Sequence, residues 1–346
     1  MPGYQIPLNA EEFRRLYYQA ADDPKVATIF WNTVGDKVLG FLERGEYYEL
    51  NTLMKSLLYY CRNYDEGAFT RIHKGNPYYF IAITSYVLGD IEAAIYFFDA
   101  ALSEDLRPEV IPPTHPITNP SPATRFLMLQ GDSERQTGQS LTKNTESHVR
   151  RAIRKYNDAC VVQGPGERQI NFDDFQQNFL APSLLSSGVG SRTLVTALIT
   201  YCLEWDIRNS YHDLGVRHGT AEPFLLNLFK GCLLFESLLR FATARGDDKS
   251  ALFKLIQNAQ RSLGFGLNEF ESLPKPTAFA DLVSYSVKGN YLPDRPLLTC
   301  IVLTYGLRNK LGHNLAINSP LDKMDYQSAH FTIFIACLHV INKFWL

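Results

Sequence analysis

Apolar residues recur along most of the chain at intervals of three and four, the spacing that places them on one face of an α-helix. Short runs that alternate apolar and polar positions, the pattern of a half-buried strand, are scarce. The sequence therefore predicts an all-α protein. The clearest candidate helices are 26–44, 48–63, 78–88, 91–103, 147–160, 191–207, 223–244, 250–262, 297–307 and 327–344.

Stretches rich in helix-breaking residues interrupt this helical pattern. Six of the 18 prolines fall between residues 108 and 122, and proline removes a backbone donor and blocks helix continuation. Residues 182–190 are rich in Ser and Gly and predict a loop before a helix that opens at Ser191. We expect a helical N-terminal domain over 1–107, a proline-rich linker and helical middle segment over 108–190, and a C-terminal domain over 191–346. Within the middle segment, the polar residues 130–144 predict a mobile loop.

The N-terminal domain ends in two helical patterns joined at Gly89. In the second pattern, Ala94, Phe98 and Ala101 supply a small, an aromatic and a small residue where antiparallel helices touch. This unit resembles one tetratricopeptide repeat, and residues 26–63 could be a degenerate copy. Any antiparallel helical pair shows similar spacing, so a repeat array and a simple hairpin both stay open. The resemblance implies a protein partner or trigger that binds at this region.

Composition and charge exclude several classes of protein. Lys and Arg number 34 against 36 Asp and Glu, so the chain is not a uniformly basic nucleic-acid binder, and 13% aromatic residues exclude a disordered chain. The six cysteines show no CxxC or paired Cys/His spacing, which argues against a zinc site and fits a reducing compartment. The first residues contain no apolar signal segment, and no segment reaches the ~20 apolar residues of a membrane span. We therefore expect a cytoplasmic protein without a membrane partner.

The candidate chemistry follows the predicted helix 297–307, where Arg308, Asn309, Lys310, His313 and Asn314 cluster. Histidine moves protons near neutral pH, a guanidinium matches phosphate oxygens, and asparagine orients a neighbour by hydrogen bonding. These groups suit phosphodiester cleavage without a metal. His313 would move the proton and Arg308 would stabilise the charge that develops on phosphorus.

Helical geometry limits how these residues can meet. Asn309 and His313 are four residues apart and share a face, whereas Arg308 and His313 are five apart and point about 140° apart on a regular helix. The latter two could converge if Gly312 ends or distorts the helix. They could also converge if the site combines residues from two copies across a two-fold axis. The second option predicts a homodimer.

The run Arg308-Asn309-x3-His313 resembles the signature of the HEPN superfamily, in which four to six residues separate Arg from His and a polar residue follows the Arg. The resemblance covers about 191–346 and implies an all-α bundle, a homodimer with facing motifs and metal-independent ribonuclease activity in toxins, abortive infection and antiviral defence. It implies that Arg308 and His313 are catalytic and Asn309 accessory. Lys310 and Asn314 become candidates for RNA contact. Leu315 stands where one branch of the family carries a tyrosine that accepts nucleotidyl groups, so we do not expect that form of control.

A similar run with one residue fewer between Arg and His occurs at Arg208, Asn209 and His212. It could line an RNA groove, or it could be the polar end of a helix before the next helix opens near Pro223, and clusters of this kind are usual at helix ends. Glu236 lies among apolar residues and could pair with an arginine of the domain, although its spacing does not show which.

A basic run, Arg150, Arg151, Arg154 and Lys155, occupies one side of the predicted helix 147–160. Such a run could hold phosphates. We favour the interpretation of a solvated helix face.

The leading hypothesis is a hydrolase of RNA that needs no cofactor, and it rests on Arg308-Asn309-x3-His313 in its helical setting. The chain has no GxGxxG, GxxxxGK[ST] or HExxH motif, so no nucleotide-binding fold or HExxH metal site is indicated. The 2′-hydroxyl of the RNA substrate would attack the adjacent phosphorus, leaving a 2′,3′-cyclic phosphate and a 5′-hydroxyl. The alternative is a non-catalytic helical adaptor that uses its HEPN-like domain to dimerise and dock partners. Replacing His313 with alanine separates the two hypotheses, since only a nuclease would lose its function.

Overall fold

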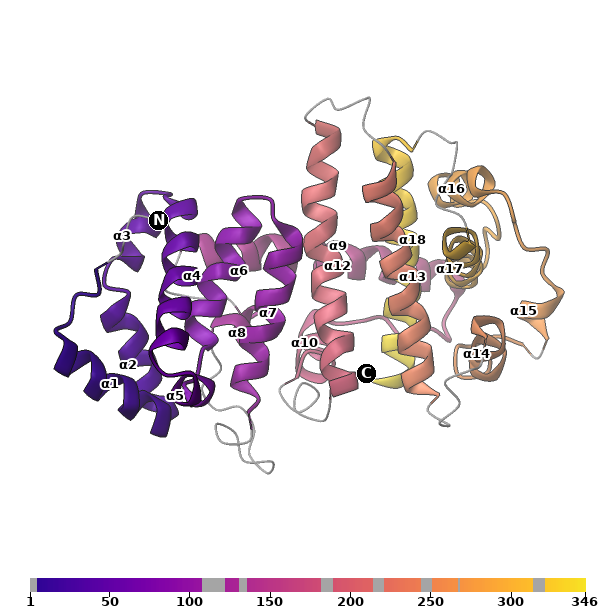
Figure 1. The fold of residues 1–346 in the computed structure, drawn as a ribbon. Coiled ribbons are helices and arrows are strands. Elements are labelled where there is room, and N and C mark those ends of the chain that lie inside the picture. The colour runs from indigo at the N-terminus through magenta and orange to yellow at the C-terminus, as the bar shows by residue number, and fades with distance from the viewer. Residues whose placement is uncertain are drawn as a thin grey trace. The chain divides into compact units, whose positions relative to one another are not determined.

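The computed structural model describes residues 5–107, 122–130, 136–181, 189–213, 221–243, 251–266, 268–313 and 321–346. Every regular element in these ranges is a helix, and no strand occurs among them (Figure 1). The all-α prediction is therefore confirmed. The chain divides into two compact units, Met1–Lys143 and Asn144–Leu346, so the division falls at residue 143 rather than at 107 and 190.

The first unit contains short and medium helices whose starts are set by polar caps. The side chains of Asn9, Asp23, Asp65 and Asp90 each accept a hydrogen bond from a backbone N–H of the helix that follows. The helices are α1 (Ala10–Asp22), α2 (Pro24–Val34), α3 (Val38–Glu43), α4 (Tyr47–Tyr64), α5 (Glu66–Arg71), α6 (Gly75–Val87), α7 (Ile91–Asp105) and α8 (Pro122–Leu127).

The single helix predicted over 26–44 is wrong, because α2 and α3 are separate. The break comes at Gly35, where a Cβ would lie 2.8 Å from the carbonyl oxygen of Trp31. Only glycine fits this turn without a shift of the backbone, and the apolar periodicity on either side hid the break.

The hairpin predicted around Gly89 is present as α6 and α7, which pack along each other. Gly89 has φ +81°, in the left-handed region that favours glycine. Ala94, Phe98 and Ala101 are fully buried, as their spacing predicted. Helix α4 packs on α6. A repeat array beyond this hairpin stays a prediction.

The second unit surrounds one central helix, α18 (Lys323–Phe344), in which every residue from Ala329 to Asn342 is buried. A helix that is buried on all sides belongs at the centre of a bundle. Figure 1 shows α12, α13 and α18 running in a similar direction, with α17 seen end-on. The other helices are α9 (Gln136–Gln163), α10 (Phe172–Asn178), α12 (Val189–Asp213), α13 (Glu222–Ala242), α14 (Leu252–Ala259), α15 (Glu269–Ser272), α16 (Phe279–Lys288) and α17 (Pro296–His313).

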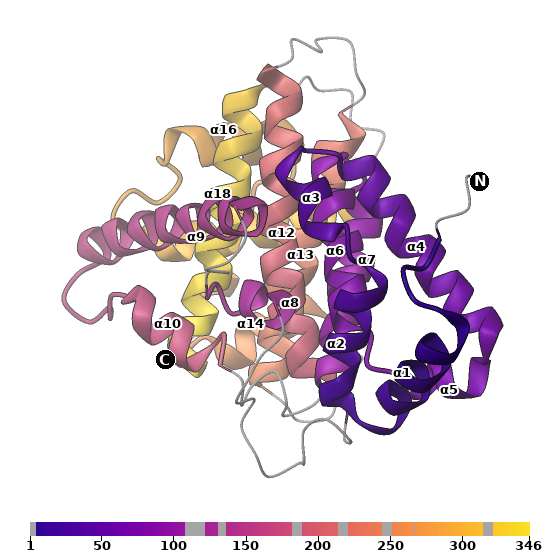
Figure 2. The same cartoon turned by 90° about the vertical axis from the view of Figure 1, so that its left-hand side faces the viewer.

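Two further expectations about this part of the chain are corrected. The loop predicted over 130–144 is helical from Gln136 onward, where Leu141 and Thr142 are buried and stabilise the helix by packing; residues 131–135 lie outside the described residues. Helix α12 begins at Val189, two residues before Ser191. Figure 2 shows α9 crossing in front of α18.

All six cysteines are buried and form no disulfide. His330 and His339 are fully buried on α18. Within the described ranges, no helix combines the length and the apolar character needed to cross a membrane.

Candidate functional site

Helix α17 carries the candidate motif and is fixed by a close approach to its neighbours. A Cβ on Gly306 would lie 2.5 Å from the side chain of Leu282 on α16 and 3.3 Å from the carbonyl oxygen of Pro276. Leu307 and Leu311 are buried, whereas Gly312 and His313 are exposed. The last residues of the helix therefore reach the surface of the bundle.

The apolar pattern predicts that this helix ends at Leu307, but α17 continues to His313. The apolar residues stop at Leu307 apart from Leu311, and one buried leucine in the next turn is enough to keep the helix on the bundle. Gly312 therefore does not end the helix before His313, so the first of the two ways in which Arg308 and His313 could converge is not present. Arg308 and His313 stay about 140° apart around a helix of 3.6 residues per turn.

Arg308 forms an ion pair with Glu236 on α13. Its Nε donates to Glu236 Oε2 at 2.8 Å, while Arg240 Nη2 donates to Glu236 Oε1 at 2.9 Å. The carboxylate is 12% exposed and the two arginine side chains are 28% and 27% exposed. The terminal nitrogens of Arg308 have no partner among the described residues. Glu236 therefore fixes the guanidinium by one edge and leaves its terminal edge for another anion.

The other motif residues lie on the same exposed end of α17. Asn309 and Lys310 are half-buried and His313 is exposed, and the side chains of the three have no hydrogen-bond partner within the described ranges. Asn314 lies outside the described residues. The structure thus presents an arginine, an amide, an amine and an imidazole near one helix end, but it does not bring Arg308 and His313 onto one face.

An apolar strip on α13 borders this site. Leu226 and Leu233 are 40% and 41% exposed, and Phe229 between them is half-buried. The strip touches the motif helix, since a Cβ on Gly312 would lie 3.5 Å from the ring of Phe229. Residues three, four and seven apart share a helical face, so this apolar strip is continuous.

The second cluster is engaged elsewhere in the bundle. Arg208 Nη2 donates to Glu204 at 3.4 Å, and Asn209 Oδ1 accepts from Gln327 Nε2 at 2.7 Å. Glu204 also forms an ion pair with Lys230 on α13. Glu204 thus contacts α13 through Lys230, whereas Arg308 contacts α13 through Glu236. The structure does not bring Arg208 and Asn209 together with Arg308. The His212 side chain lies outside what the structure describes.

Sequence reasoning missed Arg240 and His148. Arg240 follows Glu236 by four residues, a spacing that could have indicated the pair.

His148 Nε2 lies 2.9 Å from His330 Nε2, across 182 residues of sequence, and no local pattern signals such a contact. Burial lowers the pKa of His148 to about 3 and the pKa of His330 well below its ordinary value. Both rings are therefore neutral packing groups.

The hydrogen bonds of this histidine pair fix its tautomers. Asn227 Oδ1 accepts from Tyr326 OH at 2.8 Å and lies 3.3 Å from His330 Nδ1. His330 therefore donates from Nδ1 and accepts at Nε2 from His148. The pair joins α9, α13 and α18 inside the bundle.

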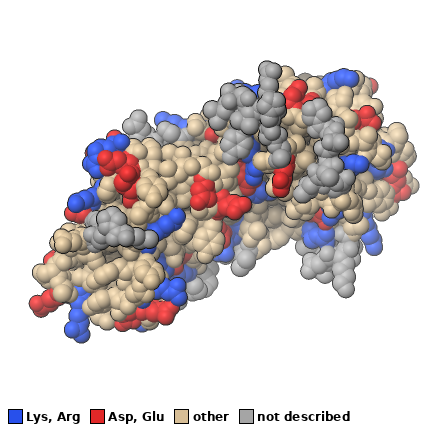
Figure 3. Space-filling model, turned by 45° about the horizontal axis from the view of Figure 1, so that its top comes forward, with Lys and Arg blue, Asp and Glu red and all other residues tan. Residues whose placement is uncertain are grey.

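Charge is mixed rather than concentrated. On the face drawn in Figure 3, Lys and Arg side chains lie among Asp and Glu side chains and form no continuous basic surface. Among the described residues, no group of three His, Cys, Asp or Glu side chains has the arrangement of a metal site. A nucleic acid that binds this face would meet local clusters of cationic side chains.

No family model, curated protein or solved structure matches this chain.

Proposed function

We propose that this protein is a metal-independent endoribonuclease whose working site combines Arg308 from one copy with His313 from another. The observation that carries the proposal is the arginine itself: Glu236 holds its Nε at 2.8 Å while its terminal nitrogens have no partner among the described residues. A guanidinium fixed in this way is ready to receive phosphate oxygens through two parallel hydrogen bonds.

The reaction needs only RNA and these side chains. The 2′-hydroxyl attacks the adjacent phosphorus, the bond to the 5′-oxygen breaks, and the products are a 2′,3′-cyclic phosphate and a 5′-hydroxyl. One His313 imidazole takes the proton from the 2′-hydroxyl or gives one to the leaving oxygen. Arg308 stabilises the extra negative charge on the phosphorane. Asn309 shares a face with His313 and would orient it, and Lys310 would contact a neighbouring phosphate.

A second copy follows from the helix geometry. Because Arg308 and His313 point about 140° apart on α17, one chain cannot direct both at one phosphate. The apolar strip of Leu226, Phe229 and Leu233 borders Arg308 and is exposed enough to form the centre of a self-complementary contact. Self-association through this strip would place the two motif helices near each other.

The test is incubation of the wild type and of His313→Ala with structured RNA in EDTA, followed by gel analysis and identification of the new ends. We expect cleavage by the wild type alone, with cyclic phosphate ends. Lys288→Ala, which removes an exposed charge from α16, is the control and should cleave normally. A 2′-deoxy substrate should stay intact because it lacks the nucleophile; its cleavage would contradict the mechanism.

The alternative function, a helical adaptor, is favoured by one observation in the first unit. Tyr48 and Tyr59 on α4 are 68% and 70% exposed and lie eleven residues apart, which places them on one face of the helix. Tyrosine is enriched at protein interfaces. If the wild type leaves all RNA intact, and a partner bound through the first unit is kept by His313→Ala, the adaptor is the better description.

A further inference from the structure

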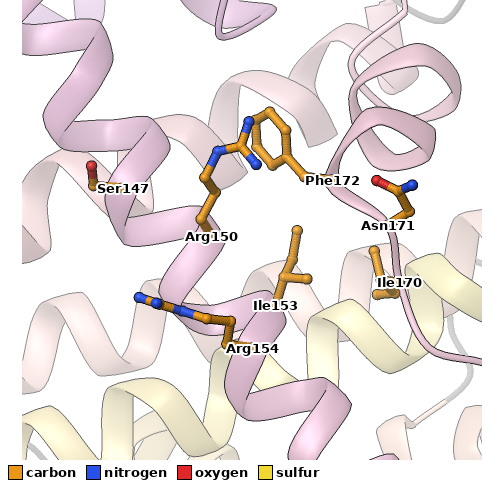
Figure 4. A pocket seen from close by; sticks show the side chains of 7 residues that line it. All are labelled: Ser147, Arg150, Ile153, Arg154, Ile170, Asn171 and Phe172. Atoms are coloured by element: carbon orange, nitrogen blue, oxygen red, sulfur yellow. The ribbon is translucent and has the colours of Figure 1, made fainter.

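A groove lies in the second unit between α9 and the segment that leads into α10. Its volume is about 410 Å³, within the range of about 300–1,000 Å³ that is typical of small-molecule sites. Figure 4 shows its walls, with Arg150 and Arg154 on α9 and Phe172 on the opposite segment. The groove contains neither Arg308 nor His313, so it is separate from the proposed cleavage site.

Arg150 is held in a fixed position on one wall. Its Nε donates to Glu146 at 2.6 Å, and its Cζ lies 3.6 Å from the centre of the Phe172 ring. Figure 4 shows the guanidinium against that ring. The carboxylate holds one edge and the ring covers one face, so the terminal edge is what remains for a ligand. A group fixed before binding loses little conformational entropy when the ligand arrives.

Arg154 lines the same groove one helical turn further along. It is exposed and forms no ion pair with any described residue, not even with Asp158 four residues later. Two guanidiniums at this spacing repel each other. A phosphate between them would replace that repulsion with charge-assisted hydrogen bonds.

The rest of the lining adds apolar surface and hydrogen-bond donors. Ile153, Ile170 and Phe172 are buried apolar side chains. Ser147 contributes a hydroxyl, and Asn171 contributes an amide whose oxygen already accepts from Asp173 N at 3.0 Å. Among the described residues that line the groove there is no carboxylate. The lining thus suits a ligand with an anionic end and a flat, less polar body.

We propose that this groove binds a nucleoside phosphate, with the phosphate between Arg150 and Arg154 and the nucleoside over Ile153 and Phe172. The basic run found in the sequence then has two parts. Arg150 and Arg154 line the groove, whereas Arg151 and Lys155 lie over the Phe331 ring, at 4.9 and 5.3 Å from its centre, and are not among the lining residues. This proposal is independent of RNA cleavage, because its readout is binding.

The experiment is calorimetric titration of the full chain with AMP, GMP, CMP and UMP, and separately with inorganic phosphate and with a single-stranded RNA oligomer. At least one nucleotide should bind more tightly than inorganic phosphate, because phosphate alone leaves the apolar lining unused. Arg154→Gln should weaken that binding by about tenfold or more, the effect of losing a hydrogen bond to a charged group. Arg151→Gln removes the same charge one residue away and should change the affinity less than about threefold, because exposed charges at a distance are screened.

Four results would overturn the proposal: no nucleotide binds, inorganic phosphate binds equally well, Arg151→Gln weakens binding as much as Arg154→Gln, or only a single-stranded RNA oligomer binds. Equal weakening by Arg151→Gln and Arg154→Gln would indicate a diffuse basic face. Binding of the RNA oligomer alone would indicate a surface for a nucleic-acid strand. Arg151 and Arg154 are exposed, so both variants should fold, and a thermal unfolding scan checks this.

Discussion

Arg308 and Glu236 lie 72 residues apart in sequence and meet at 2.8 Å between Nε and Oε2. The same carboxylate accepts from Arg240. One acid thus holds two guanidiniums, and the cluster keeps a net positive charge at the border of the apolar strip. The pairing explains why an acidic residue stands in the apolar sequence of α13, and it makes Glu236 a positioning residue for Arg308.

Replacing Glu236 with glutamine should destabilise the second unit and slow RNA cleavage. Two partly buried guanidiniums would lose their charged partner, at a cost of about 1–2 kcal/mol in the free energy of unfolding. The matched control is Glu66→Gln, which breaks a pair with Arg62 in which both side chains are more than 60% exposed. That variant should lose less than about 0.5 kcal/mol. Urea unfolding measures the free energy of unfolding of both variants. Equal losses would contradict the positioning role of Glu236.

The two glycines of the motif helix should respond to alanine in opposite directions. Gly306→Ala should destabilise the protein by about 1–3 kcal/mol, because the new Cβ would lie 2.5 Å from Leu282 and 3.3 Å from a carbonyl oxygen. A Cβ at position 312 would lie 3.5 Å from the Phe229 ring and 3.9 Å from Arg308 Nη1, and both distances are ordinary contacts. Alanine favours the helix there by up to about 1 kcal/mol. Thermal unfolding would show the contrast, and a stable Gly306→Ala would contradict the close packing of α16 on α17.

Stability should fall as the pH drops below neutrality. Burial holds the pKa of His148 at about 3 in the folded chain, whereas an exposed histidine titrates near 6.5. Between these values the unfolded chain binds more protons, so the free energy of unfolding decreases as pH falls through that window. From pH 7 to pH 5 one such histidine removes about 2 kcal/mol.

The matched variant for this pH effect is His148→Gln, which keeps a donor toward His330 but cannot titrate. Its stability at pH 7 should be lower because the ring is lost from its stack on Trp205. Its further loss between pH 7 and pH 5 should be smaller than that of the wild type by at least about 1 kcal/mol. Urea unfolding of both proteins at pH 7 and pH 5 gives these free energies. Equal losses in the wild type and in His148→Gln would contradict the conclusion that His148 is buried and neutral.

Local chemistry decided which elements the sequence could predict. The turn at Gly89 was predictable because glycine and its flanking apolar residues act within a few positions. The break at Gly35 was not, because it depends on a backbone contact with Trp31 that apolar periodicity does not contain. The length of α17 depends on Leu311, a single buried residue among polar ones.

In the candidate site, too, features set by nearby residues could be predicted, whereas contacts between distant helices could not. Arg308 and His313 could be selected by residue type and spacing, and the helix geometry that separates them follows from the sequence once the helix is known. That Glu236 is the partner of Arg308 required the packing of α13 on α17. The His148–His330 contact spans 182 residues and is set by the position of α9 on α18.

Self-association should depend on the apolar strip of α13. Leu233→Arg places a charge at one end of the strip and should prevent dimer formation, since an unpaired charge would be buried in the contact. Leu88→Arg, on an equally exposed leucine in the first unit, should leave the molar mass unchanged. Light scattering coupled to size-exclusion chromatography measures the mass, and cleavage should fall with the dimer fraction. A wild type that is monomeric at the concentrations where it cleaves would exclude a composite site.

Mixing two inactive variants tests the composite site directly. Arg308→Ala keeps His313, and His313→Ala keeps Arg308, so a mixed dimer contains one site with both residues and one site with neither. Random pairing gives half mixed dimers, and each has one of the two wild-type sites. The equimolar mixture should therefore recover about a quarter of the wild-type cleavage rate. If both residues act within one chain, the mixture stays as inactive as its components. An equimolar mixture of each variant with wild-type chain is the control for inhibition by a variant chain, because it should keep about half of the wild-type rate under either arrangement.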